Sequence, residues 1–204
     1  MRTPQLSTRP VRGRATVEEL LALPDERAAE IIDGFLVEKA SPSALHALAQ
    51  GGVIGVLGPV FQRRGGGGVP GGWWLLPEVE VELEPGQVYR PDISGWRRER
   101  LPTPTSERPV RLRPDWVCEV LSRSNAHHDL VTKFRTYHRL GVPHYWLVDP
   151  ETQVLTVYRW QEAGYLAVLT AARGETVRAE PFDALAWNVG VLFGDEPEEG
   201  PAPG

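Results

Sequence analysis

A short apolar segment, Trp116-Val-Cys-Glu-Val-Leu121, places a carboxylate where a protein interior is expected. A continuous apolar run of this length is typical of a central strand that is buried on both faces of a sheet. An unpaired carboxylate in such a place costs several kcal/mol. Glu119 therefore needs a partner, and the sequence leaves two open: a buried ion pair with an arginine such as Arg90, or a bound metal ion.

Periodic apolar patterns on both sides of this run predict a mixed β-sheet with α-helices packed on it, which is an α/β fold. Asp33-Gly34 lies between two short apolar stretches and predicts a hairpin over residues 29–38. The remaining elements expected from the patterns are strands at 73–83, 88–96, 142–148, 154–160 and 165–170, and helices at 16–24, 41–60 and 129–140.

The chain of 204 residues suits one folded domain without internal repeats. We expect residues 1–14 to form a flexible arm, residues 15–194 to form the domain, and the acidic, Pro- and Gly-rich residues 195–204 to be disordered. A single cysteine, Cys118, excludes an intramolecular disulfide and a cysteine-based zinc cluster. The N-terminal segment lacks the apolar stretch of a signal peptide, and no apolar run approaches the length of a membrane-spanning helix. These observations predict a cytoplasmic protein without a membrane partner.

Charge is distributed unevenly along the chain. The formal net charge of −5 argues against a general nucleic-acid coat protein, yet residues 86–140 carry eleven basic and six acidic side chains. Such a segment suits a localised phosphate-binding face, and it equally suits a solvated charged surface. Of the 22 basic residues only Lys39 and Lys133 are lysines. In an arginine-rich chain, a lysine marks a place where a compact ammonium group is needed.

Two further side chains join Glu119 as candidates for chemistry. Asp92 lies in the expected strand 88–96, and Lys133 lies in the expected helix 129–140. Two carboxylates from adjacent strands can hold one hard divalent cation, while a nearby ammonium group orients water or stabilises developing charge. Each residue also has a purely structural interpretation, Asp92 as a turn or helix-cap carboxylate and Lys133 as a solvated helix residue.

Several short motifs carry a more specific signal. In chain order they are Glu30-Ile-Ile-Asp-Gly-Phe-Leu-Val-Glu38, Ser41-Pro-Ser43 with His46, Arg90-Pro-Asp92, Val117-Cys-Glu-Val-Leu-Ser122, Asp129 with Lys133 and Tyr137, and Gly141-Val-Pro-His-Tyr-Trp-Leu-Val-Asp-Pro150. Together they span about residues 16–193 and resemble the Uma-two family of restriction-endonuclease-like proteins, within the PD-(D/E)xK nuclease superfamily. The resemblance implies a restriction-endonuclease-like fold, with a central mixed sheet flanked by helices.

The resemblance also implies roles for individual residues. Asp92 matches the aspartate of the superfamily motif, and Glu119 matches its second acidic residue. The usual Glu-x-Lys spacing would place the lysine at position 121, which is Leu121 here, and Lys133 on the following helix matches the displaced lysine of the family. Val120 matches the position whose backbone carbonyl completes the metal shell.

Glu30 and His46 match recurrent family positions near the site, although His46 also suits a surface position at a helix N-terminus. The chain departs from the usual pattern at Phe35, where an acidic residue is common, and at Arg123, where proline is common. Neither departure affects Asp92, Glu119 or Lys133.

The resulting hypothesis is hydrolysis of phosphodiester bonds in DNA by a magnesium-dependent endonuclease, with Mn²⁺ as an alternative ion and a homodimer as the expected assembly. In this hypothesis arginines meet the phosphate backbone, namely Arg90, Arg97, Arg98 and Arg123. The alternative is a DNA-binding or regulatory protein that has the same fold but does not cleave.

Overall fold

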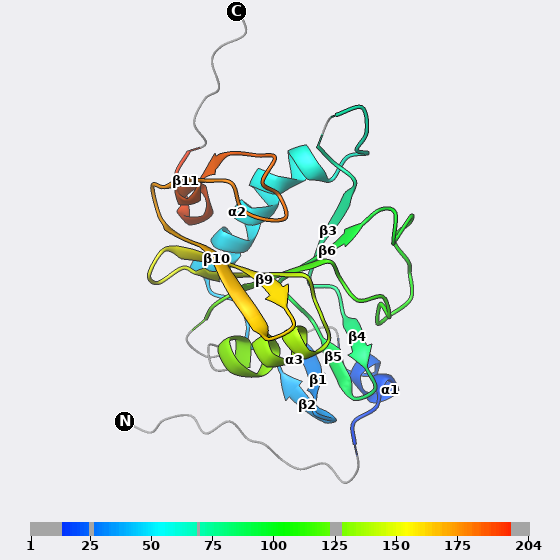
Figure 1. Ribbon diagram of the computed structural model, residues 1–204. Helices are drawn as coiled ribbons and strands as arrows, with labels where there is room; N and C mark the ends of the chain where they lie inside the picture. Colours follow the sequence, from blue (N-terminus) through cyan, green and yellow to red (C-terminus); the bar gives the residue numbers. More distant parts are fainter. Residues whose placement is uncertain (1–13, 25–26, 69, 123–127, 197–204) are drawn as a thin grey trace, which may run out of the picture.

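The computed structural model describes residues 14–24, 27–68, 70–122 and 128–196, and Figure 1 shows their arrangement. Most of the predicted N-terminal arm, most of the predicted acidic tail, and Arg123 lie outside the described residues. Within the described part the chain is a mixed α/β structure, as the sequence predicts.

The central element is a six-stranded sheet with the strand order β10-β9-β8-β7-β6-β3. The apolar run forms β7, which pairs in parallel with β8 on one side and antiparallel with β6 on the other. Trp116, Cys118 and Glu119 are all at most 1% exposed, which confirms the prediction of a buried central strand. The strands of this sheet are β3 (Trp73–Pro77), β6 (Ile93–Arg97), β7 (Trp116–Val120), β8 (His144–Asp149), β9 (Val154–Gln161) and β10 (Gly164–Ala172).

Helices cover both faces of this sheet (Figure 1). The long helix α2 (Ala44–Phe61) packs against the face that carries Trp116 and Cys118. The opposite face, which carries Val117, is covered by α3 (Phe134–Arg139). Because side chains alternate along a strand, Glu119 points to the same face as Val117, toward α3.

A second sheet of four strands has the order β2-β1-β5-β4. Its first hairpin turns at Asp33 and Gly34, whose φ angles of 54° and 81° are those of the turn that favours glycine, as predicted. The strands of this sheet are β1 (Ala29–Ile32), β2 (Phe35–Glu38), β4 (Val81–Glu84) and β5 (Gln87–Tyr89).

The prediction of two long strands at 73–83 and 88–96 is wrong in one respect. Each segment is broken, so that β3 and β6 belong to the large sheet whereas β4 and β5 belong to the small one. One break occurs at Glu78, whose φ of 54° interrupts extended backbone, and the other at Pro91, which has no N–H to donate to a neighbouring strand. The two breaks lie side by side, since the Glu78 N–H donates to the Asp92 carbonyl at 3.2 Å. Asp92 therefore lies at the junction of the two sheets rather than within a strand.

The remaining elements are short. α1 (Val17–Leu21) begins at Thr16 with the predicted reciprocal hydrogen bonds between Thr16 and Glu19. The predicted helix at 129–140 starts as a π-helix, η1 (His128–Lys133), before it continues as α3. Near the C-terminus, β11 (Thr176–Val177) and β12 (Trp187–Asn188) form a small ladder, and the 3₁₀ helix η2 (Val189–Phe193) packs against α2.

One helix of the described part, α2, is long and apolar enough by length and composition to cross a membrane. Its mean hydropathy is 1.5 over 18 residues, so the expectation that no run approaches this length is corrected. This is weak evidence for a membrane span, because the core helix of a soluble protein meets the same criteria. Here Ala49, Val53, Leu57 and Phe61 of α2 are buried in the main core.

The close approach of α2 and η2 makes two neighbouring glycines respond oppositely to substitution. A Cβ at Gly52 would lie 2.9 Å from the Leu192 Cα and 3.0 Å from the Val191 carbonyl oxygen, whereas a Cβ at Gly51 meets nothing within 4 Å. We expect Gly52→Ala to lower the free energy of unfolding by about 1–3 kcal/mol through overpacking. The matched control Gly51→Ala raises it by about 0.5–1 kcal/mol through helix propensity. Urea denaturation measures both changes, and stabilisation by Gly52→Ala would contradict the packing of η2 on α2.

Candidate active site

Asp92 is the meeting point of several segments. It follows Pro91 at the start of β6 and is 1% exposed. Its Oδ2 accepts a hydrogen bond from the backbone N–H of Val120 at 2.7 Å, and its Oδ1 lies 2.8 Å from the Nζ of Lys39. The carboxylate is thus held by a strand on one side and by an ammonium group on the other, which excludes the simple turn or helix-cap interpretation.

Glu119 projects from β7 toward α3. Its Oε1 accepts a hydrogen bond from the Tyr137 hydroxyl at 2.8 Å and lies 3.2 Å from the Nζ of Lys133. Its Oε2 accepts from the Asp92 N–H at 3.4 Å. The sequence left open an arginine or a metal ion as the partner of this buried carboxylate. In the structure Lys133 is a cationic partner of this carboxylate, while the side chain of Arg90 lies against Glu78 instead.

Lys133 ends the π-helix η1 and is 2% exposed, so it is not a solvated helix residue. Its Nζ lies 3.0 Å from the Glu30 Oε1 as well as 3.2 Å from Glu119. A buried ammonium group is stable only when paired, and two carboxylates provide that pairing. Glu30, on β1, also accepts a hydrogen bond from the Arg90 backbone N–H at 2.8 Å. The structure therefore brings Glu30, Glu119 and Lys133 together.

The second lysine of the chain lies in the same place. Lys39 follows β2, and its Nζ contacts Asp92 at 2.8 Å, Glu78 at 3.0 Å and the Arg90 carbonyl at 2.9 Å. Sequence reasoning did not place Lys39 or Glu78 at the site. The scarcity of lysine was a signal for Lys39, because both lysines of the chain lie in one cluster of carboxylates, Lys133 buried and Lys39 with a side chain that is 9% exposed.

Helix α2 contributes two side chains from one face. His46 and Gln50 are four residues apart, which places them one helical turn apart on the same side. The His46 Nε2 lies 3.3 Å from the Asp92 Oδ1, and the Gln50 Nε2 donates to the Asp92 carbonyl at 2.8 Å. The start of the helix is fixed by Ser43, whose hydroxyl accepts from the His46 N–H at 3.2 Å. His46 is 6% exposed, so the surface interpretation of this histidine is wrong.

Burial and neighbouring charges both shift the pKa values of the groups at this site. Burial alone would raise the pKa of Asp92, but the hydrogen bond from His46 and the positive charge of Lys39 outweigh it and hold that pKa below its usual range. Burial would lower the pKa of Lys39, yet the charges of Asp92 and Glu119 raise it. Burial and the charge of Glu119 raise the pKa of Tyr137 well above its usual value. Asp92 is thus ionised, Lys39 is charged, and Tyr137 keeps the proton that it donates to Glu119.

A divalent metal ion fits the side chains around Asp92. Ligand atoms of His46, Glu78 and Asp92 all lie within 4.8 Å of one another. Two carboxylates suit a hard cation such as Mg²⁺ or Mn²⁺, and an imidazole nitrogen favours Mn²⁺ over Mg²⁺. Among the described residues, the buried His46 Nδ1 has no hydrogen-bond partner, so the ring retains unused donor or acceptor capacity. His46 and Glu78 are ligand candidates that the sequence reasoning did not assign.

The metal ligands predicted from the resemblance are Asp92, Glu119 and the Val120 carbonyl. This set shares only Asp92 with the group of His46, Glu78 and Asp92. Glu119 Oε1 contacts Tyr137 and Lys133, and Val120 reaches Asp92 through its N–H. Participation of Glu119 and of the Val120 carbonyl in metal binding therefore stays a prediction.

Asp92, Glu119 and Lys133 line one cavity of about 350 Å³, together with Lys39, His46, Gln50 and Glu78. Of the arginines predicted to meet phosphate, Arg90 lines this cavity. Arg97 and Arg98 lie at the other end of β6, where their guanidinium groups stack 4.0 Å from the Trp73 ring and 3.6 Å from the Trp74 ring. Their place is therefore away from the cavity, and Arg123 lies outside the described residues.

Comparison with known proteins identifies the family and the fold of the chain. The model of the Uma2 family, described as "Putative restriction endonuclease", matches residues 17–190. The chain belongs to this family. The crystal structure of a "putative nuclease" from Anabaena variabilis is similar, with 25% sequence identity and a TM-score of 0.64, over 88% of this chain and 97% of that one. No curated protein matches. These two matches support a restriction-endonuclease-like fold and, in general terms, a nuclease.

The buried and exposed ion pairs of the η1–α3 segment should differ in their effect on stability. Replacing Lys133 with methionine leaves Glu30 and Glu119 without this buried counter-charge, and we expect a loss of about 3–5 kcal/mol in unfolding free energy. Arg139 forms an exposed pair with Glu84, and Arg139→Met serves as the control, with a loss of at most about 1 kcal/mol. Chemical denaturation followed by circular dichroism measures both. Equal effects of the two substitutions would contradict the buried position of Lys133.

Proposed function

We propose that this protein is a metal-dependent endonuclease that hydrolyses phosphodiester bonds in DNA. The observation that carries the proposal is the joint burial of Asp92, Glu119 and Lys133 at one cavity, in a chain that belongs to a family described as putative restriction endonucleases. Buried charges that are not needed for packing are concentrated at functional sites.

Asp92, with His46 and Glu78, would hold the ion. A bound Mg²⁺ or Mn²⁺ lowers the pKa of coordinated water and stabilises negative charge on phosphate. Asp92 is suited to this role because its carboxylate stays ionised and is fixed by the Val120 N–H. Gln50 and the Glu78 N–H fix the adjacent backbone through the Asp92 carbonyl.

Lys133 would orient the attacking water or stabilise the charge that develops on the phosphate. Its ammonium group lines the cavity and is held in place by Glu30 and Glu119. Tyr137, protonated, fixes the orientation of the Glu119 carboxylate that positions Lys133. Glu119 would thus act through Lys133. Arg90, at the cavity wall, would offer its guanidinium group to a phosphate of the nucleic-acid strand.

Two further parts of the proposal concern the setting of the reaction. We take the working protein to be a cytoplasmic homodimer, an assembly that would present two such cavities to its nucleic-acid substrate. A single chain per active unit would nick one strand at a time.

One observation favours a second candidate, a DNA-binding or regulatory protein that does not cleave. The Lys39 ammonium contacts both Asp92 and Glu78, two of the three candidate ligands of the ion. An internal cation at this position competes with a divalent ion for the same oxygens. Strong competition would leave a folded nucleic-acid-binding site without turnover.

Cleavage assays separate the two candidates. We expect the protein to cut DNA in Mn²⁺ or Mg²⁺, to stop when a chelator is added, and to lose on the order of 100-fold or more in rate in Asp92→Ala. Glu162→Ala, at an exposed position in the turn between β9 and β10, is the control and keeps the wild-type rate. Equal cleavage by Asp92→Ala and wild type, with both folded, would overturn the role of Asp92. Binding without cleavage in any divalent ion would favour the non-cleaving candidate.

A further inference from the structure

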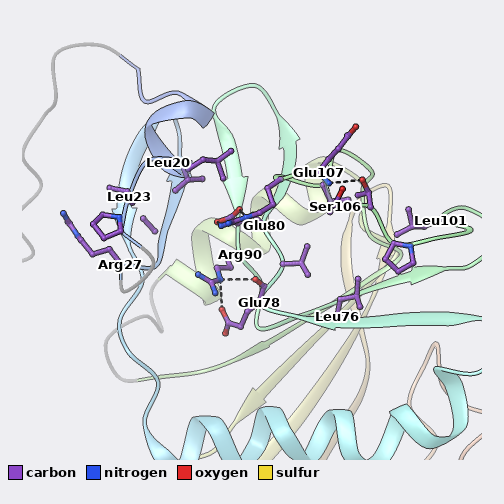
Figure 2. Close-up of a pocket in the computed structure, with 18 residues that line it drawn as sticks. Leu20, Leu23, Arg27, Leu76, Glu78, Glu80, Arg90, Leu101, Ser106 and Glu107 are labelled. Atoms are coloured by element: carbon purple, nitrogen blue, oxygen red, sulfur yellow. Dashed lines mark hydrogen bonds and ion pairs between the residues drawn. The ribbon is translucent and has the colours of Figure 1, made fainter.

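A second cavity, of about 590 Å³, lies next to the candidate active site. The two cavities share two lining residues, Glu78 and Arg90. These residues form an ion pair with the Arg90 Nε 3.1 Å from the Glu78 Oε2, and Figure 2 shows the pair at the base of the second cavity. This ion pair therefore lies where the two cavities meet, and Glu78 is itself one of the candidate metal ligands.

The walls of the second cavity come from segments far apart in the sequence. Leu20 and Leu23, at the end of α1, lie on one side, and Leu101 and Ser106, in the connection between β6 and β7, lie on the other (Figure 2). Leu76 of β3 adds a further apolar surface. The lining thus combines apolar side chains with hydroxyl and guanidinium groups and with the carboxylates of Glu78, Glu80 and Glu107.

The connection that forms one wall is held in place by specific bonds. Arg108 makes two hydrogen bonds to the Glu80 carboxylate, at 2.9 and 2.8 Å, and the Val110 N–H donates to the Glu80 carbonyl at 2.8 Å. At the other end of the connection, the Leu101 carbonyl accepts from the Trp74 indole N–H at 2.8 Å. The cavity is therefore bounded by anchored backbone on this side.

We propose that this cavity receives one nucleotide of the substrate strand, with its base out of the helical stack, while the adjoining phosphate lies at Asp92. The inference rests on the proposed nuclease function. The cavity falls within the range of about 300–1,000 Å³ that is usual for small-molecule sites. Leucine side chains suit the faces of a base, Ser106 and Thr105 offer hydroxyls to its edge, and Arg90 stands where the phosphate would pass.

The position of Glu78 links the two cavities chemically. Its carboxylate belongs to the candidate metal ligands and at the same time lines the second cavity. A phosphate that reaches the ion would therefore have its attached nucleoside beside Glu78 and Arg90. A base that is paired and stacked in a duplex cannot enter such a space without being extruded, which costs a few kcal/mol and least in a single strand. The structure thus assigns single-stranded nucleic acid as the preferred substrate class.

Binding without hydrolysis is the first test. The full-length protein in Ca²⁺ is titrated against a fluorescein-labelled single-stranded DNA, an RNA of the same sequence, and the matching DNA duplex, with anisotropy as the readout. We expect the single strand to bind about tenfold more tightly than the duplex, and Ser106→Trp, which fills the cavity, to weaken single-strand binding about tenfold. Thr103→Trp is the matched control, because Thr103 lies in the same exposed connection but does not line this cavity.

Cleavage in Mn²⁺ is the second test and needs no protein variant. A single abasic nucleotide is moved stepwise along the DNA strand, and the cutting rate at each phosphate is measured. We expect one position relative to the cut to slow cleavage about tenfold, since an abasic unit removes the base that would occupy the cavity. The comparison of DNA with RNA shows which sugar the nucleotide carries.

The outcomes for the cavity and for the nuclease function are distinct. Cleavage of duplex and single strand at equal rates, with no effect of Ser106→Trp or of the abasic unit, would overturn the nucleotide cavity and leave the nuclease intact. Single-strand binding that Ser106→Trp weakens and Thr103→Trp does not, without cleavage in any metal ion, would support the cavity and overturn the nuclease. If Ser106→Trp fails to fold, a failure of the single strand to bind more tightly than the duplex overturns the proposal by itself.

Discussion

The arrangement of the site depends on the carboxylate of Asp92. One of its oxygens accepts the Val120 N–H of the central strand, and the other faces the ammonium of Lys39 and the imidazole of His46. Two parts of the chain that are far apart in the sequence, residues 39–46 and β7, therefore converge on two atoms of Asp92. Because Asp92 is 1% exposed, its charge must be balanced within the protein, and the balance comes from Lys39 and His46, whose side chains are 9% and 8% exposed. The same ion pairs therefore stabilise the fold and position the side chains of the candidate site.

Those ion pairs form two connected groups. Lys133 lies between Glu30 and Glu119, whereas Lys39 lies between Glu78 and Asp92. The hydrogen bond from the Asp92 N–H to Glu119 joins the groups. An ammonium group presents a compact charge with three donors, which suits a narrow space between carboxylates better than a planar guanidinium. This explains why a chain that otherwise uses arginine has lysine at these two positions.

The sequence was informative wherever a local pattern reflects a tertiary environment. The apolar run around Glu119 predicted a buried carboxylate, and the family motifs predicted that Asp92 and Lys133 would lie beside it. Local patterns could not place Lys39, since the contact with Asp92 spans 53 residues and Lys39 follows an ordinary hairpin strand. The division of two apparent strands between two sheets was also hidden, because alternation of apolar residues continues on both sides of Glu78 and Pro91.

That division has a mechanical consequence. The β3–β4 and β5–β6 segments both leave one sheet for the other near Glu78 and Asp92. The joint between the two sheets is therefore also part of the candidate active site. Glu30, Lys39 and Glu78 are attached to the small sheet or its edges, whereas Glu119 belongs to the large one. A change in the angle between the two sheets would therefore change the spacing of these opposed charges. The angle between the two sheets and the geometry of the candidate site are thus set by the same joint.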